Sequence, residues 1–240
     1  MGKIIAVCGS PASGKTTAAL KIAQEIYAMN AGSVLYISPD MTVPSLAYIF
    51  PSFKDGELYS LGAALDRTDI FQDDVLQYIV STKDAKNFGY MGFKLGENRY
   101  TYPRVTEDKV LSFFRVAAGI GNYVVIDCSC DHDDLVSTLA KSRADEVVML
   151  VNPDLKCLSY FGSNADQFSA VADKAVKVMN IVDKDLYLPI RDIQNHYKDI
   201  SFTLPYSRAI KQQAIAGTLS ERLGDKRYIS TVKGIAKAVI

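Results

Sequence analysis

Eight residues near the start of the chain have the types and spacing of a phosphate-binding loop, or P-loop. They are Gly9-Ser10-Pro11-Ala12-Ser13-Gly14-Lys15-Thr16, and Thr17 follows them. Small residues let successive backbone N–H groups converge on phosphate oxygens, and the start of the next helix adds free N–H groups and partial positive charge. We predict that Lys15 reaches the β- and γ-phosphates of a nucleotide and that the Thr16 hydroxyl binds Mg²⁺. The alternative is a tight glycine turn with an exposed lysine.

An acidic residue at the end of a second apolar run supplies what a Mg²⁺-nucleotide site further requires. Tyr123-Val124-Val125-Ile126-Asp127 is a strand-like run that ends in an aspartate. Carboxylate oxygens are ligands that Mg²⁺ prefers, and nucleotide-binding proteins place one at such a strand end. We therefore predict that Asp127 holds the metal shell. The alternative is that Asp127 only caps a loop or helix.

The elements that must position these residues alternate between short apolar runs and helix-like stretches. A buried strand is expected at Lys3–Cys8, directly before the P-loop, and a helix at Lys15–Met29, directly after it. Further strands are expected at 33–38, 123–127, 146–151, 176–180 and 200–204, and further helices at 134–141, 155–171, 188–197 and 208–219. This alternation predicts an α/β fold, with a doubly wound, mostly parallel sheet and helices on both faces.

The middle of the chain, from Ser52 to Arg104, is its least regular part. Helices are expected around Glu57–Leu65 and Gln72–Thr82, followed by a glycine-rich patch at 89–96. We interpret the segment as an insertion between core strands, where specificity for a substrate or partner would lie. With 240 residues, of which 48% are hydrophobic, the chain is expected to form one domain, residues 1–240.

Several strand ends, taken in order, resemble those of the MinD/ParA family of P-loop ATPases. The matching segments are 14–17, 34–40, 122–127, 144–148, 179–183 and 204–207. The resemblance spans nearly the whole chain outside Ser52–Arg104. It implies a P-loop NTPase fold with ATP and Mg²⁺ as cofactors, and a slow ATPase that acts as a switch in positioning, partitioning or assembly.

The resemblance also implies roles for residues outside the P-loop. Asp40 matches an aspartate that positions the attacking water and contributes to the metal shell, so Lys15, Asp40 and Asp127 are the expected catalytic residues. Asn180 matches an asparagine that bonds the adenine edge, and Pro205 and Tyr206 match a loop that covers the base. From the residues alone, Asp40 could instead cap a helix over 43–50, and Asn180 could be a turn former.

Two positions depart from the family pattern. Most MinD/ParA proteins have a lysine at the place of Ser10, and it crosses a dimer to reach the partner's phosphates. The Asp-x-Asp found in many members is Ser38-Pro39-Asp40 here. The expected homodimer should therefore be weakened, or held by other cations such as Lys94 or Arg99.

The bulk composition excludes some classes of function. Lys plus Arg and Asp plus Glu number 27 each, so no overall field draws the chain to nucleic acid or to an anionic membrane. No apolar run is long enough to span a bilayer. We expect a cytoplasmic protein whose four cysteines are reduced.

Three weaker signals favour ordinary structure over function. The segment Cys128–Asp134 contains thiols, an imidazole and carboxylates, but a solvated loop is favoured over a metal site. The amphipathic C-terminal stretch 228–240 is expected to pack on the sheet and not on a membrane. Arg99, Arg104 and Arg115 could be lid arginines of a kinase, but surface arginines are commoner.

The leading interpretation is an ATP-dependent switch that binds a protein partner the sequence does not identify. One alternative is a nucleotide-binding interaction protein with little or no hydrolysis, and another is a P-loop small-molecule kinase. Adenine is favoured because Asn180-Ile181-Val182-Asp183 lacks the lysine of the Asn-Lys-x-Asp motif that reads guanine, although GTP stays open.

Overall fold

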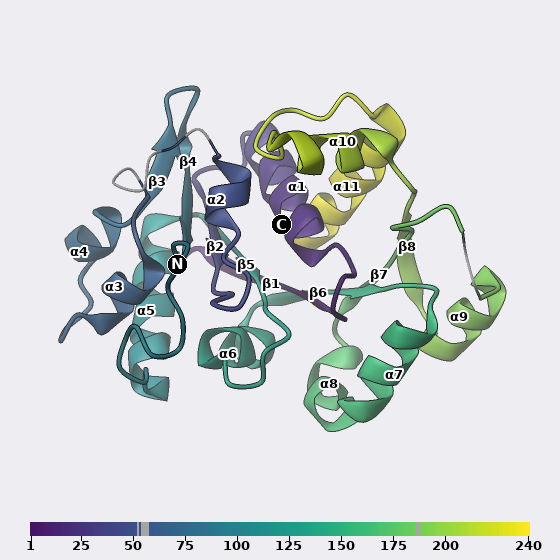
Figure 1. The fold of residues 1–240 in the computed structure, drawn as a ribbon, viewed down its shortest axis with the longest axis horizontal. Helices are drawn as coiled ribbons and strands as arrows, with labels where there is room; N and C mark the ends of the chain where they lie inside the picture. The colour runs from purple at the N-terminus through teal and green to yellow at the C-terminus, as the bar shows by residue number, and fades with distance from the viewer. Residues whose placement is uncertain (52, 54–57, 186–187) are drawn as a thin grey trace.

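The computed structural model describes residues 1–51, 53, 58–185 and 188–240, and an eight-stranded sheet lies at its centre (Figure 1). The strand order is β3-β4-β2-β5-β1-β6-β7-β8, and every neighbouring pair is parallel except β3 with β4. The strands are β1 (Lys3–Gly9), β2 (Val34–Ser38), β3 (Val80–Thr82), β4 (Ala85–Gly92), β5 (Tyr123–Asp127), β6 (Glu146–Val151), β7 (Val176–Asn180) and β8 (Ile200–Leu204). The predicted doubly wound, mostly parallel sheet is confirmed.

Helices cover both faces of this sheet (Figure 1). They are α1 (Lys15–Ala28), α2 (Leu46–Ile49), α3 (Leu61–Asp66), α4 (Gln72–Leu76), α5 (Glu107–Ile120), α6 (Leu135–Arg143), α7 (Leu155–Ser163), α8 (Ala165–Ala172), α9 (Ile190–Tyr197), α10 (Arg208–Ala216) and α11 (Lys226–Val239). α1 and α11 pack together on one face, and α5 and α6 on the other. The central strands are therefore buried on both sides, which explains why they are continuous apolar runs in the sequence.

The alternation of side chains along β1 shows how the two cores are divided. Ile4, Ala6 and Cys8 belong to the core under α5 and α6, whereas Ile5 and Val7 belong to the core under α1 and α11. All five are buried. Because β1 occupies a central place between β5 and β6, its carboxyl end brings the P-loop to the middle of the sheet edge.

The segment interpreted as an insertion is partly core, which corrects the sequence prediction. β4 pairs in parallel with β2, and β3 pairs with β4 at the sheet edge. The helix predicted over Gln72–Thr82 ends at Leu76, and the one predicted over Glu57–Leu65 runs over Leu61–Asp66, with Ser52 and Glu57 outside the described residues. The strand β4 was missed because its glycines are typical of a loop. Here glycine is required by close packing, since a Cβ on Gly89 would lie 2.5 Å from Ile79 Cγ2.

One further helix prediction changes in detail, and another is confirmed. The helix expected over 155–171 is interrupted at Asn164, whose amide Nδ2 donates to the Tyr160 carbonyl. The C-terminal helix is confirmed to pack on the protein itself, because Val232, Ile235 and Val239 are buried against α1 and β8. Among the described residues, no helix is long and apolar enough to cross a membrane.

Candidate functional site

The P-loop connects the end of β1 to the start of α1, and two of its glycines are required by the backbone. Gly14 has φ +80° at the N-cap of α1, in the left-handed region that favours glycine. A Cβ on Gly9 would lie 2.7 Å from the Leu150 carbonyl oxygen on β6. No side chain caps the start of α1, and its first turn holds no acidic residue. The first N–H groups of this helix are thus left without an internal acceptor and face the loop.

The predicted phosphate-binding lysine is held by two acceptors. Lys15 Nζ lies 2.9 Å from the Ser10 carbonyl oxygen and 3.0 Å from Cys130 Sγ. Cys130 Sγ in turn lies 3.3 Å from the Gly9 carbonyl oxygen. Neither acceptor of Lys15 is a carboxylate. An anion in this place would therefore compete well for the ammonium group.

The carboxylate of Asp127 lies at the end of β5 and is 3% exposed. The Tyr36 hydroxyl donates to its Oδ2 over 3.1 Å, and the Thr16 side chain also hydrogen-bonds it. Burial raises the pKa of Asp127 from 3.8 to about 6, although the bond from Thr16 and the charge of Lys15 oppose the change. Two of the three residues predicted to hold Mg²⁺, Thr16 and Asp127, are thus in contact.

Asp40 follows β2 and is half-buried. Its Oδ1 accepts hydrogen bonds from the backbone N–H groups of Thr42 (2.8 Å) and Val43 (2.9 Å). The helix that follows is shorter than the one predicted over 43–50, and its N-cap is Ser45. Asp40 therefore holds a turn at the end of β2 and is not the cap of that helix.

A cavity of about 580 Å³ brings most of the predicted site residues together. It is lined by Pro11, Ala12, Gly14, Lys15, Thr16, Thr17, Asp40, Thr42, Val43, Asp127, Cys128, Cys130 and Asp131. Gly9, Ser10 and Ser13 of the P-loop are buried. An ammonium, a hydroxyl and carboxylates around one cavity are the donor set that a Mg²⁺-bound polyphosphate needs, so these residues fit such a group.

The residues predicted to bind the base lie at the ends of β7 and β8, and one of them, Asn180, contacts the P-loop. Asn180 is buried, and its Nδ2 donates to the Ser13 carbonyl over 2.8 Å. A Cβ on Gly14 would lie 2.7 Å from that same nitrogen. Pro205 and Tyr206 follow β8, and the Tyr206 ring faces the ammonium of Lys211 at 5.1 Å. Asn180 therefore supports the P-loop directly, while its contact with adenine stays a prediction.

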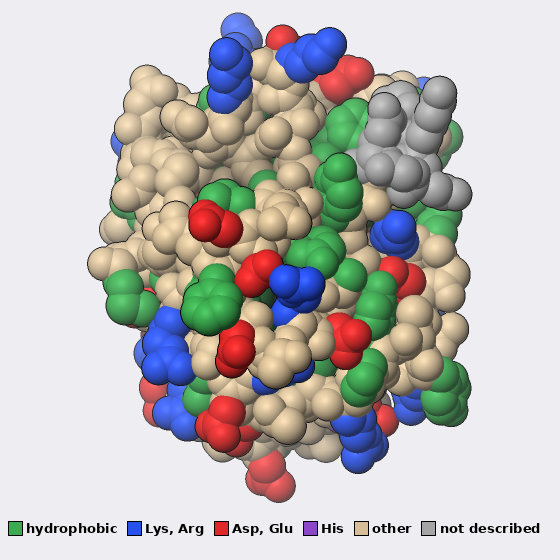
Figure 2. Space-filling model, turned by 90° about the vertical axis from the view of Figure 1, so that its left-hand side faces the viewer, with side chains coloured by type: hydrophobic (Ala, Val, Ile, Leu, Met, Phe, Trp, Pro, Cys, Tyr) green, Lys and Arg blue, Asp and Glu red, His purple; other side chains and the backbone are tan. Residues whose placement is uncertain are grey.

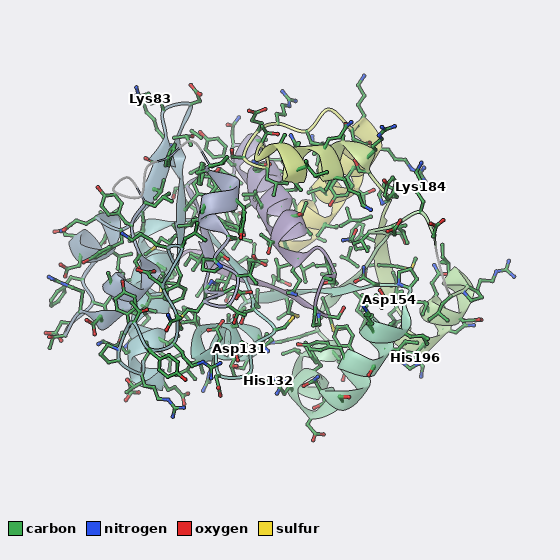
Figure 3. The ribbon with its side chains drawn as sticks, in the orientation of Figure 1. Lys83, Asp131, His132, Asp154, Lys184 and His196 are labelled. Carbon is green, nitrogen blue, oxygen red and sulfur yellow. The ribbon has the colours of Figure 1, made fainter. Side chains whose placement is uncertain are left out.

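The loop after Asp127, residues 128–134, is held by serine hydroxyls. Asp134 caps α6, and its Oδ2 accepts from Ser129 Oγ over 2.7 Å. His132 pairs with Gln167 of α8, and Figure 3 shows Asp131 and His132 together beside α6. In the described ranges, no group of three or more His, Cys, Asp or Glu side chains is arranged to hold a metal ion.

Sequence reasoning missed the contacts of two residues at this site, Tyr36 and Cys130, and did not predict the ion pairs of a third, Arg99. Tyr36 reaches Asp127 because β2 pairs with β5. Cys130 contacts Lys15 because the loop after β5 turns back over the P-loop. Arg99, raised before as a lid arginine or an alternative cation, pairs with Asp131 and Asp133. No spacing within one segment of the sequence points to the contacts of Tyr36 or Cys130.

A second hollow, of about 650 Å³, lies around α3 and α4 in the middle segment. Its lining includes Asp66, Arg67, Phe71, Asp74 and Tyr102. Figure 2 faces this side of the molecule, and acidic, basic and hydrophobic side chains are interspersed on it. Arg67 and Asp74 pair at 2.9 Å. The hollow contains no residue of the P-loop or of the loop 128–134.

Solved structures with the same fold are ATPases of the ParA and MinD type, whereas no protein-family model and no curated protein matches the sequence. A ParA family ATPase from Chlorobium tepidum shares 15% identity, with a TM-score of 0.74 over 99% of each chain. The cell division ATPase MinD from Pyrococcus furiosus shares 17% identity, with a TM-score of 0.74 over 99% of this chain and 98% of that one. MinD from Pyrococcus horikoshii, complexed with Mg-ADP, shares 17% identity, with a TM-score of 0.73 over 100% and 96%. The chain thus has the P-loop NTPase fold of these proteins.

Proposed function

We propose that this chain, which has the fold of the ParA and MinD ATPases, is an ATP-binding switch that hydrolyses ATP slowly with Mg²⁺. One observation carries the proposal: Lys15, Thr16, Asp40 and Asp127 line a single cavity at the start of α1. Proteins of similar structure are described as acting in cell division and plasmid partition. We propose the same kind of role, in positioning, partitioning or assembly in the cytoplasm, for residues 1–240 as a single domain.

Different residues of the chain bind the nucleotide and promote its hydrolysis. The backbone N–H groups of the P-loop and of α1 hold phosphate oxygens, and Lys15 exchanges the Ser10 carbonyl and the Cys130 thiol for phosphate. Thr16 and Asp127 hold Mg²⁺, which neutralises phosphate charge when bound. Asp40 orients the attacking water through Oδ2, because the hydrogen bonds of its turn go to Oδ1. Asn180, Pro205 and Tyr206 contact the base.

A second candidate is an interaction protein that binds nucleotide with little hydrolysis. It is favoured by Ser10, which adds no charge to the P-loop and is 2% exposed. For the same reason, we propose that any ATP-dependent homodimer is weaker than in relatives with a lysine there. The partner protein would bind the loops after β2 and β5 in one nucleotide state and not in another, because these loops line the cavity.

Phosphate release tests the proposal against both alternatives. Purified protein is incubated with Mg-ATP, with Mg-GTP, and with ATP in excess chelator, and binding is measured in parallel by calorimetry. The switch predicts slow release that requires Mg²⁺ and favours ATP. Tight binding without release would support the interaction protein. Release or transfer only after addition of nucleoside monophosphates or sugars would support a kinase, and absence of binding would refute all three.

A further inference from the structure

The cavity is short of positive charge. Of the residues that line it in the described part of the chain, Lys15 carries the one positive charge, against three carboxylates, on Asp40, Asp127 and Asp131. A nucleoside triphosphate adds several negative charges, and a single Mg²⁺ offsets only part of them. Repulsion between the phosphates and these carboxylates disfavours binding of the nucleotide unless another cation is present. Ser10 does not provide it.

An additional cation, Arg99, pairs with a carboxylate of the cavity lining. Its Nη2 lies 3.6 Å from Asp131 Oδ2, and its Nη1 lies 3.3 Å from Asp133 Oδ2. Asp131 lines the cavity, so the guanidinium lies at the cavity rim. Arg99 comes from the connection between β4 and α5, far away in sequence from the P-loop.

The backbone around Arg99 is anchored by neighbouring side chains, whereas the Arg99 side chain itself is largely exposed. Glu97 Oε2 accepts from the Lys94 N–H and from Ser60 Oγ, both over 2.7 Å, and Glu97 Oε1 accepts from the Tyr102 hydroxyl over 2.6 Å. The Arg99 side chain is 57% exposed. Ion pairs between exposed side chains contribute little to stability, so Arg99 can readily exchange them for a phosphate.

We propose that Arg99 is the second phosphate-binding cation of this site and contacts the terminal phosphate of a nucleoside triphosphate. The inference rests on the proposed function and assigns to Arg99 the charge that Ser10 lacks. A guanidinium has five N–H donors and a planar shape that suits phosphate oxygens, so it can bind phosphate and keep one bond to Asp131. The contact adds charge from within the same chain, without a partner subunit.

The alternative is that Arg99 only holds the loop 128–134 in place. The two roles differ in ligand dependence. A loop support would affect triphosphate and diphosphate nucleotides alike, because both need the P-loop and Lys15. A cation on the terminal phosphate affects the triphosphate selectively.

The test measures binding of a non-hydrolysable Mg-ATP analogue and of Mg-ADP by calorimetry for wild type, Arg99→Ala, Arg99→Lys and the control Arg104→Ala. Arg104 is exposed in the same connection. We expect Arg99→Ala to weaken analogue binding about tenfold, because it removes a charge-assisted hydrogen bond to phosphate, and to change ADP binding less than about twofold. Arg99→Lys should restore part of the affinity, and Arg104→Ala should match wild type.

Equal losses for both nucleotides, or no loss, would overturn the role of Arg99 while leaving nucleotide binding in place. Wild-type protein that binds neither nucleotide would instead refute the proposed function, and the inference with it. Thermal unfolding of each variant shows whether an altered fold explains a loss of affinity. If Arg99→Ala is unstable, Arg99→Lys provides the test: its affinity for the analogue, relative to its affinity for ADP, should be lower than in wild type.

Discussion

The two sides of the cavity are built in different ways. The P-loop side, residues 9–17, is one continuous segment whose shape follows from glycines and a helix start. The opposite side is assembled from strand ends and loops that are distant in sequence: Tyr36 and Asp127 meet across 91 positions, and Lys15 meets Cys130 across 115. A local motif therefore fixes where phosphate would bind, while the tertiary fold fixes the charge state around it.

The two sides also differ in electrostatics. The P-loop side offers N–H groups and one ammonium, which attract anions. The opposite side offers Asp40, Asp127 and Asp131, and burial already disfavours the charged form of Asp127. The first side should dominate affinity, and the second should dominate turnover and pH dependence. Substitutions on either side test this division.

The largest effect is expected on the P-loop side, at Lys15→Ala. Removing a charged partner of bound phosphate costs about 2–5 kcal/mol, or on the order of several hundred-fold in affinity for Mg-ATP. The melting temperature should be nearly unchanged, because the hydrogen bonds of the Lys15 ammonium to the described residues go to a carbonyl oxygen and a thiol. Calorimetry and circular dichroism measure the two quantities. Lys3→Ala, at the opposite end of β1, is the control, and unchanged ATP binding by Lys15→Ala would refute the P-loop assignment.

Asp40→Asn should act on turnover and not on binding. An asparagine keeps an Oδ1 acceptor for the Thr42 and Val43 N–H groups, so the turn is preserved. It lacks the charge that orients water, and a general acid–base or orienting group contributes on the order of 100-fold to the rate. Phosphate release under saturating Mg-ATP measures the effect. Equal turnover in variant and wild type would leave Asp40 with a structural role alone.

The sequence predicted the P-loop side better than the opposite side, for a physical reason. The strand before the loop and the helix after it were predicted almost to the residue, because the period of hydrophobic residues and the placement of glycines are local signals in the sequence. Asp127 was found from a local run as well. The roles of Tyr36 and Cys130 depend on strand order and on the path of a loop, which no spacing in one chain segment encodes. β4 was missed because its glycines, needed for close packing, imitate a loop.

Asp127→Asn should stabilise the protein at neutral pH. Because the pKa of Asp127 is raised in the folded state, the folded chain binds more protons than the unfolded chain between about pH 4 and 6. Its free energy of unfolding therefore falls as pH rises through this window, by at most about 3 kcal/mol. A neutral asparagine at this position removes the decrease in the free energy of unfolding with pH.

Urea unfolding in the presence of chelator checks this at pH 4.5, 5.5 and 7.5. The stability gain of Asp127→Asn over wild type should grow with pH, whereas the exposed control Asp69→Asn should show no such growth. A gain that is constant with pH would show that packing, and not the buried charge, explains it. The variant should also lose Mg²⁺-dependent ATP binding.

The smallest effect is expected at Tyr36→Phe, which removes a donor from the side of the cavity that carries the carboxylates. Burial raises the pKa of the Tyr36 hydroxyl, so it stays protonated and donates to Asp127 Oδ2. Loss of this bond should raise the pKa of Asp127 by about one unit, because a hydrogen bond to a charged group contributes about 1.5–3 kcal/mol and Ser38 Oγ, 3.5 Å from the same oxygen, compensates in part. A protonated carboxyl does not bind Mg²⁺. Mg-ATP affinity should then fall only about twofold at pH 7 but several-fold at pH 6.

Comparing Tyr36→Phe with wild type at each pH cancels the protonation of ATP itself. Tyr90→Phe is the matched control, because Tyr90 is a buried neighbour whose ring centroid lies 6.1 Å from that of Tyr36 on the adjacent strand β4. If both variants show the same pH profile, the hydroxyl of Tyr36 does not tune Asp127. In that case the charge of Lys15 and the bond from Thr16 alone would keep the carboxylate available, and the two sides of the cavity would be more closely coupled than their separate construction implies.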